Sequence, residues 1–320
     1  MNPVVAAHPA VGDRPAITYR AAGDRYLLVE YGEMTMNLEL NFFVLAVTGS
    51  LAGHPPGGLI EAAPGFRSLL LHYDPARITQ QTLVGALEEI HSAQPAVRSL
   101  RIPSRKIVLP LAFDDAASRE AVRRYATTIR ADAPNVRDDS NIDYILEYNG
   151  LPDHQALSDT VLGTPWWNAY TGFFPGLPFL FPLDPRNAIT VPKYNPTRTW
   201  TAEGAVGIGG PCVAIYPVEA PGGYQLFGRT VPVYDILARH EVFREDPLLI
   251  RPGDRVEFRP VTEDELLQAR RDVLENRYEY MISDDVFSVA GYLDGIAPLA
   301  AEAERARLVR EAAAAGTEVP

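Results

Sequence analysis

The first hundred residues alternate short apolar segments of strand character with two longer apolar stretches of helical length. Strand-like patterns occur in pairs around the turns Gly23-Asp24 and Pro64-Gly65, at 17–20, 26–31, 59–63 and 68–73. Helical spacing covers 36–51, and Thr79 is a plausible cap for a second helix that reaches His91. This ββαββα order predicts a small α+β sandwich over 16–100, with both helices on one face of an antiparallel sheet. Residues 1–15 show no periodic apolar face, so we expect a flexible arm there.

The pattern changes after residue 100. Apolar alternation predicts a strand over 106–111, and Asp114-Asp115 can cap a helix that follows it. A second helix is expected over 141–148, since Asn149-Gly150 suits the left-handed conformation found after helix ends. From 166 to 260, Gly and Pro recur between short apolar runs, a texture typical of a closed or nearly closed β-barrel. We therefore expect a β-barrel domain with a helical insertion over 101–262.

The remaining residues, 263–320, read as a C-terminal helical extension. Helical patterns cover 264–276 and, in an Ala/Glu/Arg-rich stretch, 299–315. The second of these is expected to be an exposed helix that awaits a partner. The fold class is thus α+β: an N-terminal α/β sandwich, a barrel and a helical tail.

Charge and composition exclude several classes of protein. The 29 basic and 41 acidic side chains give a net charge of -12, which disfavours binding to a nucleic acid backbone. No apolar run approaches the roughly 20 residues that span a membrane, and no export signal is evident, so a cytoplasmic protein is expected. The single Cys212 cannot form an internal disulfide and reads as a small buried side chain. The six histidines are not at metal-ligand spacings, so no metal site is predicted.

Unusual residues concentrate in the barrel region and form an ordered series. The segments are Tyr170–Phe179, Lys193–Trp200, Val206–Gly210 and Tyr216–Thr230, with Arg67-Ser68-Leu69, Tyr73-Asp74-Pro75, Leu183-Asp184-Pro185-Arg186 and Arg251-Pro252-Gly253-Asp254 around them. Together these motifs resemble the family of allophanate hydrolase subunit 1 and the 5-oxoprolinase B subunit, the C and D subdomains of the urea carboxylase carboxyltransferase. The resemblance runs from about residue 16 to 283.

Different motifs resemble different branches of that family. Lys193–Trp200, the Asn149-Gly150-Leu151 signal and Gly222–Gln225 are similar to the urea carboxylase branch, which we take as nearest. Phe173–Leu180 is instead similar to the branch of the 5-oxoprolinase B subunit.

The resemblance implies a cyclophilin-like barrel and a C/D-type subunit of a biotin-dependent carboxyltransferase that acts on urea or a related guanidine or amide. It also implies an active site shared with a companion A/B subunit. Carboxybiotin would be carried by a separate protein, because the chain ends at Pro320 and has no biotinylation motif. The biotin carrier and the biotin carboxylase are accordingly expected as separate chains. Two alternatives stay open: the B subunit of an ATP-dependent 5-oxoprolinase-type amidohydrolase, and a regulatory protein of the kind that inhibits a histidine kinase.

Carboxyl transfer from biotin to a urea-like nitrogen requires donors for the developing negative charge and an acceptor for a proton. Lys193 and Arg198 supply cationic donors on a segment broken by Pro196, although surface ion pairs would explain them equally. Arg198 is preferred, because a guanidinium can bind a carboxylate or bicarbonate bidentately. Glu219, between prolines and ahead of a Gly-Gly turn, is the candidate base, and a solvated turn glutamate is the alternative.

Four neighbouring side chains are candidates for substrate binding: Tyr194, Asn195, Tyr224 and Gln225. Tyr224 is equally compatible with core packing. The glycines of 206–210 lack the context of a phosphate loop and are expected to form a tight turn. Phe173–Phe179 is expected to shape an apolar wall or a subunit interface. No residue is assigned to cofactor binding.

Overall fold

The computed structural model describes residues 3–320, which form two compact units. The first unit contains the chain up to Ser104 together with Asp285–Gly295, and the second contains Arg105–Asp284 and Ile296–Pro320. The expected C-terminal extension is therefore divided between the units.

The first unit is a five-stranded antiparallel sheet with two helices. Its strand order is β1-β2-β3-β5-β4. The strands are β1 (Val4–His8), β2 (Ile17–Ala21), β3 (Tyr26–Tyr31), β4 (Leu59–Pro64) and β5 (Ser68–Tyr73), and the helices are α1 (Leu38–Gly53), α2 (Gln80–Ala93) and the 3-10 turn η1 (Val97–Ser99). Both predicted hairpins, both predicted helices and the Thr79 cap are confirmed.

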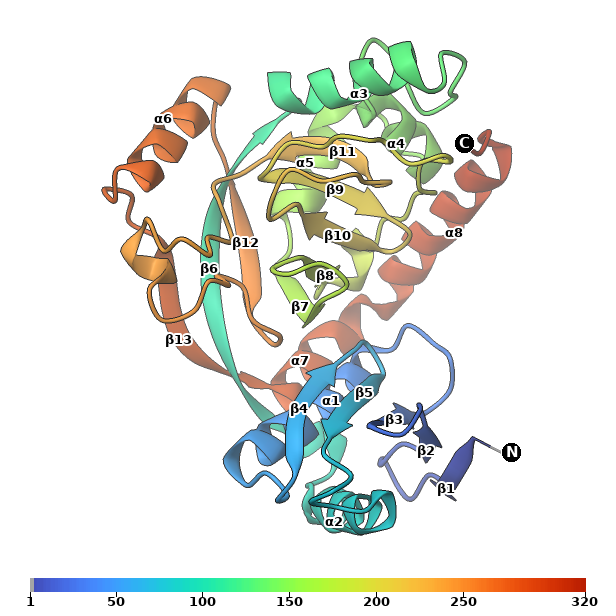
Figure 1. Ribbon diagram of the computed structural model, residues 1–320. Helices are drawn as coiled ribbons and strands as arrows, with labels where there is room; N and C mark the ends of the chain where they lie inside the picture. The colour runs from blue at the N-terminus through green and yellow to red at the C-terminus, as the bar shows by residue number, and fades with distance from the viewer. Residues whose placement is uncertain (1–2) are drawn as a thin grey trace. The chain divides into compact units, whose positions relative to one another are not determined.

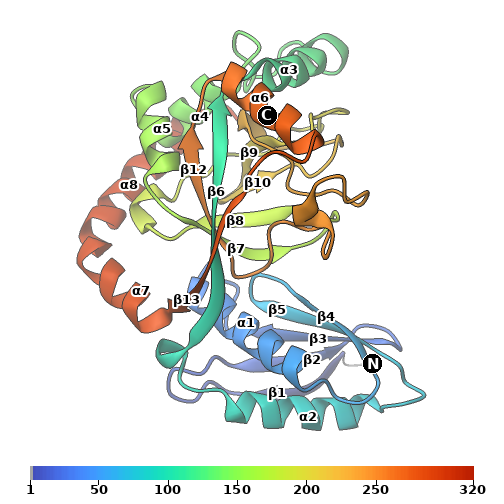
Figure 2. The same cartoon turned by 90° about the vertical axis from the view of Figure 1, so that its left-hand side faces the viewer.

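Alternation along the strands explains why both helices lie on one face of this sheet (Figure 2). In β3, every second residue is fully buried, as period-two packing requires. Tyr31 packs edge-on against Phe43 of α1 and pairs with His91 of α2 through its hydroxyl, 2.9 Å from Nε2. One sheet face thus meets both helices, and together they enclose the core of the unit.

The expectation of a flexible arm over 1–15 is wrong for the described part of that segment. Val4–His8 forms an edge strand that pairs antiparallel with β2. The main-chain groups of β2 provide a hydrogen-bonding edge that needs no apolar pattern on the incoming strand, which is why side-chain periodicity missed it. Met1 and Asn2 lie outside the described residues.

The second unit is built on a closed β-barrel, which confirms the predicted architecture (Figure 1). Strands follow the order β11-β9-β10-β8-β7-β12-β6, and a further pairing between β11 and β6 closes the ring of seven. The strands are β6 (Arg101–Phe113), β7 (Trp166–Thr171), β8 (Pro178–Pro182), β9 (Ala205–Gly209), β10 (Cys212–Ile215), β11 (Gln225–Arg229) and β12 (Arg255–Pro260). Within the ring, β6 and β12 pair in parallel, and the other neighbours are antiparallel.

Helices and short turns surround the barrel. They are α3 (Ala116–Thr128), α4 (Ile142–Asn149), α5 (His154–Leu162) and α6 (Glu263–Leu274), with 3-10 turns η2 (Pro185–Asn187) and η3 (Glu241–Phe243). Asp115 caps α3 by accepting from the amides of Ala117 and Ser118 at 3.0 and 3.2 Å, as predicted. Gly150 ends α4 in the left-handed conformation with φ 62°. Helix α5 was not predicted from the pattern.

The tail differs from its expectation in two ways. A strand, β13 (Met281–Ser288), joins the sheet beside β6, and α7 (Val289–Ile296) and η4 (Ala297–Leu299) follow it. The last helix, α8 (Ala300–Gly316), does not await a partner, because it packs on α4 and η2 of its own unit. Arg310 fastens it by donating to the Arg186 carbonyl at 2.6 Å. An Ala-rich helix with no strong apolar stripe gave no sign of this packing in sequence.

Candidate functional site

A cavity of about 370 Å³ opens beside β8 and β10 and is the candidate site. Three connecting segments and two strands supply its walls, so it is assembled from parts of the chain far apart in sequence. The lining residues are Phe173, Phe174, Leu177, Phe179, Lys193, Thr197, Ala214, Tyr216, Pro217, Ala220, Pro221, Gly222, Gly223 and Tyr224. We refer to it as the Lys193 cavity. Four residues of Phe173–Phe179 line this cavity, which agrees with an apolar wall, the first of the two roles expected for that segment.

Lys193 carries the only charge among the described residues that line this cavity. It is one of two lysines in the sequence, and its Nζ lies 5.3 Å from the centre of the Tyr224 ring. Among residues 3–320 its ammonium group forms no ion pair with a carboxylate. A cation held over an aromatic face in an apolar cavity without a counterion is suited to meet an anionic group.

Tyr224 forms the floor beneath that ammonium group. Its hydroxyl lies 3.0 Å from Sγ of Cys212, and burial raises the pKa of both groups, so both remain protonated. The ring lies so close to Gly209 that an added Cβ there would come within 2.3 Å of it. Gly210, with φ 59°, then turns the chain from β9 into β10. The prediction of a tight turn therefore holds only at Gly210, because Val206–Gly209 belongs to strand β9. Gly209, within the strand, leaves room for Tyr224.

Arg198 lies behind the cavity wall rather than on it. Its side chain is 1% exposed, and its guanidinium donates to the Tyr224 carbonyl at 2.6 Å and to Thr201 Oγ1 at 3.2 and 3.3 Å. A longer contact of 3.4 Å reaches the Tyr216 hydroxyl. The ring of Tyr194 stacks on it at 4.5 Å. All of these partners are neutral, which is rare for a buried cation.

Two of the predicted substrate-binding residues, Tyr194 and Asn195, do not line the cavity. Tyr194 is 3% exposed, and its hydroxyl accepts from Asn141 Nδ2 at 2.6 Å. Asn195 is exposed, and its carbonyl accepts from Arg130 at 3.2 Å.

Gln225 is fully buried in the strand that follows Tyr224. Its Oε1 accepts from Asn135 Nδ2 at 2.9 Å, and its Nε2 donates to the Pro192 carbonyl at 2.8 Å. The amide thus ties the segment before Lys193 to the barrel. Its contacts hold the cavity in shape and leave the amide without access to a ligand.

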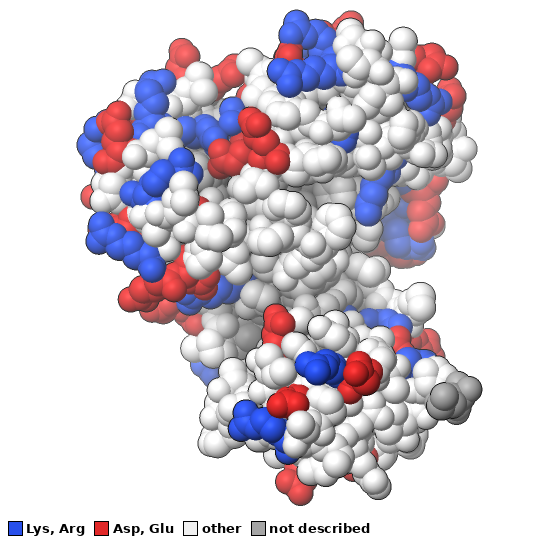
Figure 3. Space-filling model, in the orientation of Figure 1, with Lys and Arg blue, Asp and Glu red and all other residues white. Residues whose placement is uncertain are grey.

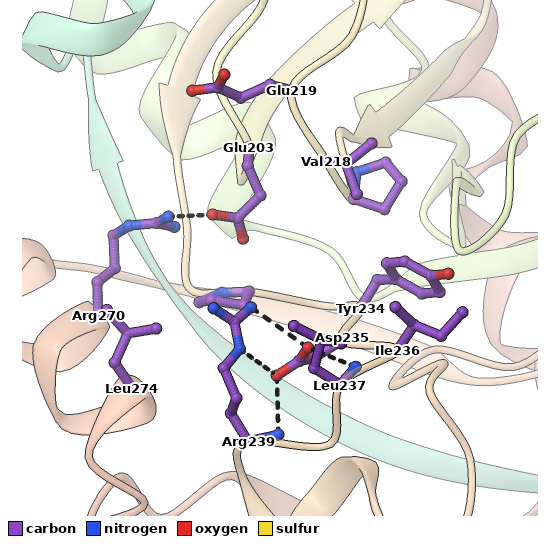
Figure 4. A pocket seen from close by; sticks show the side chains of 12 residues that line it. Glu203, Val218, Glu219, Tyr234, Asp235, Ile236, Leu237, Arg239, Arg270 and Leu274 are labelled. Carbon is purple, nitrogen blue, oxygen red and sulfur yellow. Dashed lines mark hydrogen bonds and ion pairs between the residues drawn. The ribbon is translucent and has the colours of Figure 1, made fainter.

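Glu219 lines a second cavity, of about 300 Å³, and not the Lys193 cavity (Figure 4). Two ion pairs lie there, Arg270 with Glu203 and Arg239 with Asp235. Figure 4 shows the Glu219 carboxylate apart from both pairs. The structure therefore brings Lys193 and Tyr224 together and separates them from the predicted base.

Tyr216 and Thr197 are polar cavity residues that sequence reasoning missed. Tyr216 follows β10 directly, lines the Lys193 cavity and is 6% exposed. Its place in an apolar run gave only the signal of a core residue. Contact with Arg198 across the barrel wall depends on tertiary structure.

The surface of the second unit over β8 and β10 carries few charges in the view of Figure 3, and acidic and basic side chains are interspersed around it. Among residues 3–320, no group of three or more His, Cys, Asp or Glu side chains could hold a metal ion. No helix in that range combines the length and apolar character needed to cross a membrane.

Comparison with known proteins gives a consistent family. The family described as carboxyltransferase domain, subdomain C and D, matches residues 17–243. The chain is 38% identical over 283 residues to urea amidolyase of Lachancea kluyveri, covering 88% of this chain and 15% of that protein. It is 27% identical over 241 residues to the 5-oxoprolinase B subunit of Bacillus subtilis, covering 75% of this chain and 91% of that protein.

A solved structure agrees with the sequence comparison. The crystal structure of Kluyveromyces lactis urea carboxylase aligns with a TM-score of 0.82 at 34% identity, covering 97% of this chain and 29% of that one. The chain therefore spans less than a third of the length of both the urea amidolyase and the urea carboxylase.

Proposed function

Because the chain belongs to the carboxyltransferase family of subdomains C and D, of the urea carboxylase type, we propose that it is the C/D component of a biotin-dependent carboxyltransferase. The proposed acceptor is urea or a related guanidine or amide. The proposed partners are a companion A/B subunit, a biotin carrier and a biotin carboxylase. One observation carries the proposal: in a domain of this family, the described residues form an apolar cavity lined by a single cationic side chain and no carboxylate.

The residues of the Lys193 cavity fit the biotin ring system in their chemistry. Aromatic and aliphatic walls suit a compact, largely apolar bicycle, and a volume of about 370 Å³ is within the range of small-ligand pockets. The Lys193 ammonium and the hydroxyl of Thr197 are donors for a polar edge. Carboxybiotin, when bound, supplies the carboxyl group that the acceptor nitrogen receives.

In this proposal the chain contributes electrostatics. Lys193 stabilises negative charge that develops on the ureido oxygen, and no carboxylate among the described residues of the cavity wall competes for the ammonium group. Arg198 acts as a positioning residue, because it holds the carbonyl of Tyr224 and the segment around Thr201. Within residues 3–320 no carboxylate lines the cavity, so we assign the proton acceptor to the companion subunit. Glu219 then serves its own cavity, outside the transfer step.

The test is reconstitution of the complex from this chain, the companion subunit, the biotin carboxylase and the biotinylated carrier. We expect carboxylation of urea or guanidine that depends on ATP, bicarbonate, biotin and this chain. Lys193→Gln should lower kcat by on the order of a hundredfold, the effect of losing one donor to a developing oxyanion. Lys106→Gln, at the other lysine of the sequence, is the matched control.

A different outcome would identify the main alternative. The relation to the 5-oxoprolinase B subunit raises ATP-dependent opening of 5-oxoproline as a second activity. Turnover of 5-oxoproline without biotin, together with no carboxylation of urea or guanidine, would overturn the carboxyltransferase assignment.

A further inference from the structure

The Tyr216 hydroxyl has an arrangement that packing alone does not require. It accepts two hydrogen bonds, from Arg198 Nη2 and from the Tyr224 amide, each at 3.4 Å. Among residues 3–320 it donates to no acceptor. A hydroxyl has one proton and two lone pairs, so both acceptor positions are in use and the donor position is free.

Arg198 places a positive charge beside this hydroxyl, 3.4 Å from its oxygen. The guanidinium is 1% exposed and has only neutral partners, so its charge is not cancelled inside the protein. A cation that donates to a hydroxyl oxygen polarises the O–H bond and strengthens donation by its proton. In an apolar cavity this effect is larger than in water.

The shape of the wall keeps the hydroxyl in place. Gly222 lies against it so closely that an added Cβ would come within 2.1 Å of the hydroxyl oxygen. Gly222 is itself held to Arg198 by two main-chain hydrogen bonds of 2.9 and 3.1 Å. Tyr216 and Gly222 line the Lys193 cavity, and both are held in place by Arg198, which lies behind the wall.

We propose that the Tyr216 hydroxyl, polarised by the uncompensated charge of Arg198, donates a hydrogen bond to a negatively charged oxygen of the ligand in the Lys193 cavity. The anion is shared between two groups: Lys193 supplies charge from the open side, and Tyr216 supplies a directed donor from the wall. The identification of that oxygen as the ureido oxygen of biotin rests on the proposed function. The preference of the cavity for an anion is independent of the proposed function.

The test uses the full chain and two probes of equal shape, 4-methylbenzoate and its neutral amide, 4-methylbenzamide. Isothermal titration should show that the wild-type chain binds the carboxylate more tightly than the amide. Tyr216→Phe keeps the ring and should weaken carboxylate binding by about tenfold, the effect of one charge-assisted hydrogen bond, with amide binding unchanged. Tyr148→Phe, a tyrosine of the same unit outside the cavity, should behave as the wild type.

Two results would overturn the inference. One is equal binding of the two probes by the wild type, or no binding of the carboxylate at millimolar concentration. The other is a Tyr216→Phe variant that keeps the full preference, since Lys193 alone would then account for it. If the preference and its loss are both observed but the reconstituted complex transfers no carboxyl group, the proposed function fails while the anion site stands.

Discussion

Replacement of Gly222 by alanine tests the geometry of the cavity wall most directly. The new Cβ would lie 2.1 Å from the Tyr216 hydroxyl oxygen and 2.5 and 2.6 Å from Cε1 and Cζ of its ring. The main chain at Gly222 cannot retreat easily, because it exchanges two hydrogen bonds with Arg198. The tyrosine ring must therefore move, by roughly 1 Å if it is to reach ordinary contact distance.

The expected loss of stability follows from that movement of the Tyr216 ring. Overpacking of a buried site destabilises by about 1–3 kcal/mol, which corresponds to a fall in Tm of roughly 2–12 °C for a unit of this size. The two contacts to the Tyr216 hydroxyl are already 3.4 Å long, so the same displacement breaks both. We therefore expect Gly222→Ala to lose the preference for 4-methylbenzoate as fully as Tyr216→Phe does.

The assay combines thermal unfolding with titration of the two benzoate-type probes. Gly172→Ala is the matched control, because nothing lies within 4 Å of an added Cβ there and the residue is not part of the lining. A Gly222→Ala protein with wild-type Tm and wild-type probe binding would refute this account of how the wall holds Tyr216.

Three further predictions concern stability. Burial, with a smaller contribution from His8, lowers the pKa of His91 to about 4. The folded chain therefore takes up this proton at a lower pH than the unfolded chain, whose histidine titrates near 6.5. The stability contributed by neutral His91 is complete above about pH 6.5 and is lost as the pH falls toward 4, by up to ~3 kcal/mol. In urea unfolding, the free energy of unfolding of His91→Gln should therefore fall less between pH 6.5 and 4 than that of the wild type. An equal fall in both proteins would contradict the role of His91. Asp254→Asn removes the carboxylate that Arg105 Nε contacts at 3.0 Å and should destabilise by roughly 3 kcal/mol in the same assay, whereas a change within error would show the pair to be dispensable. Asp115→Ala removes the cap of α3 and should lower the free energy of unfolding by about 1–2 kcal/mol. The control is Asp115→Asn, which retains a capping oxygen. Equal stability of the two variants would argue against the capping role.

The site residues show where sequence reasoning reached its limit. Lys193 and Tyr224 were predicted and do meet at one cavity, 5.3 Å apart. Arg198 was preferred over Lys193 as a ligand contact, yet it is buried behind the wall. Both lie on one short segment of the chain, and pattern alone could not say which one faces the cavity, since that depends on where the segment crosses the barrel. Tyr216 was missed for the same reason.

The sequence by itself determined the local elements of secondary structure and the family to which the chain belongs. Period-two alternation, caps such as Thr79 and Asp115, and turn glycines act within a few residues, so they identified most strands and helices and the barrel texture of 166–260. The ordered motifs identified the family. Tertiary structure alone decided the edge strand β1, the packing of α8 on α4, and the separation of Glu219 from Lys193. Strand pairing at a sheet edge, helix packing and barrel closure join groups that are distant in sequence. These contacts stabilise the fold without requiring a periodic pattern in the residues that make them, so the sequence did not reveal them.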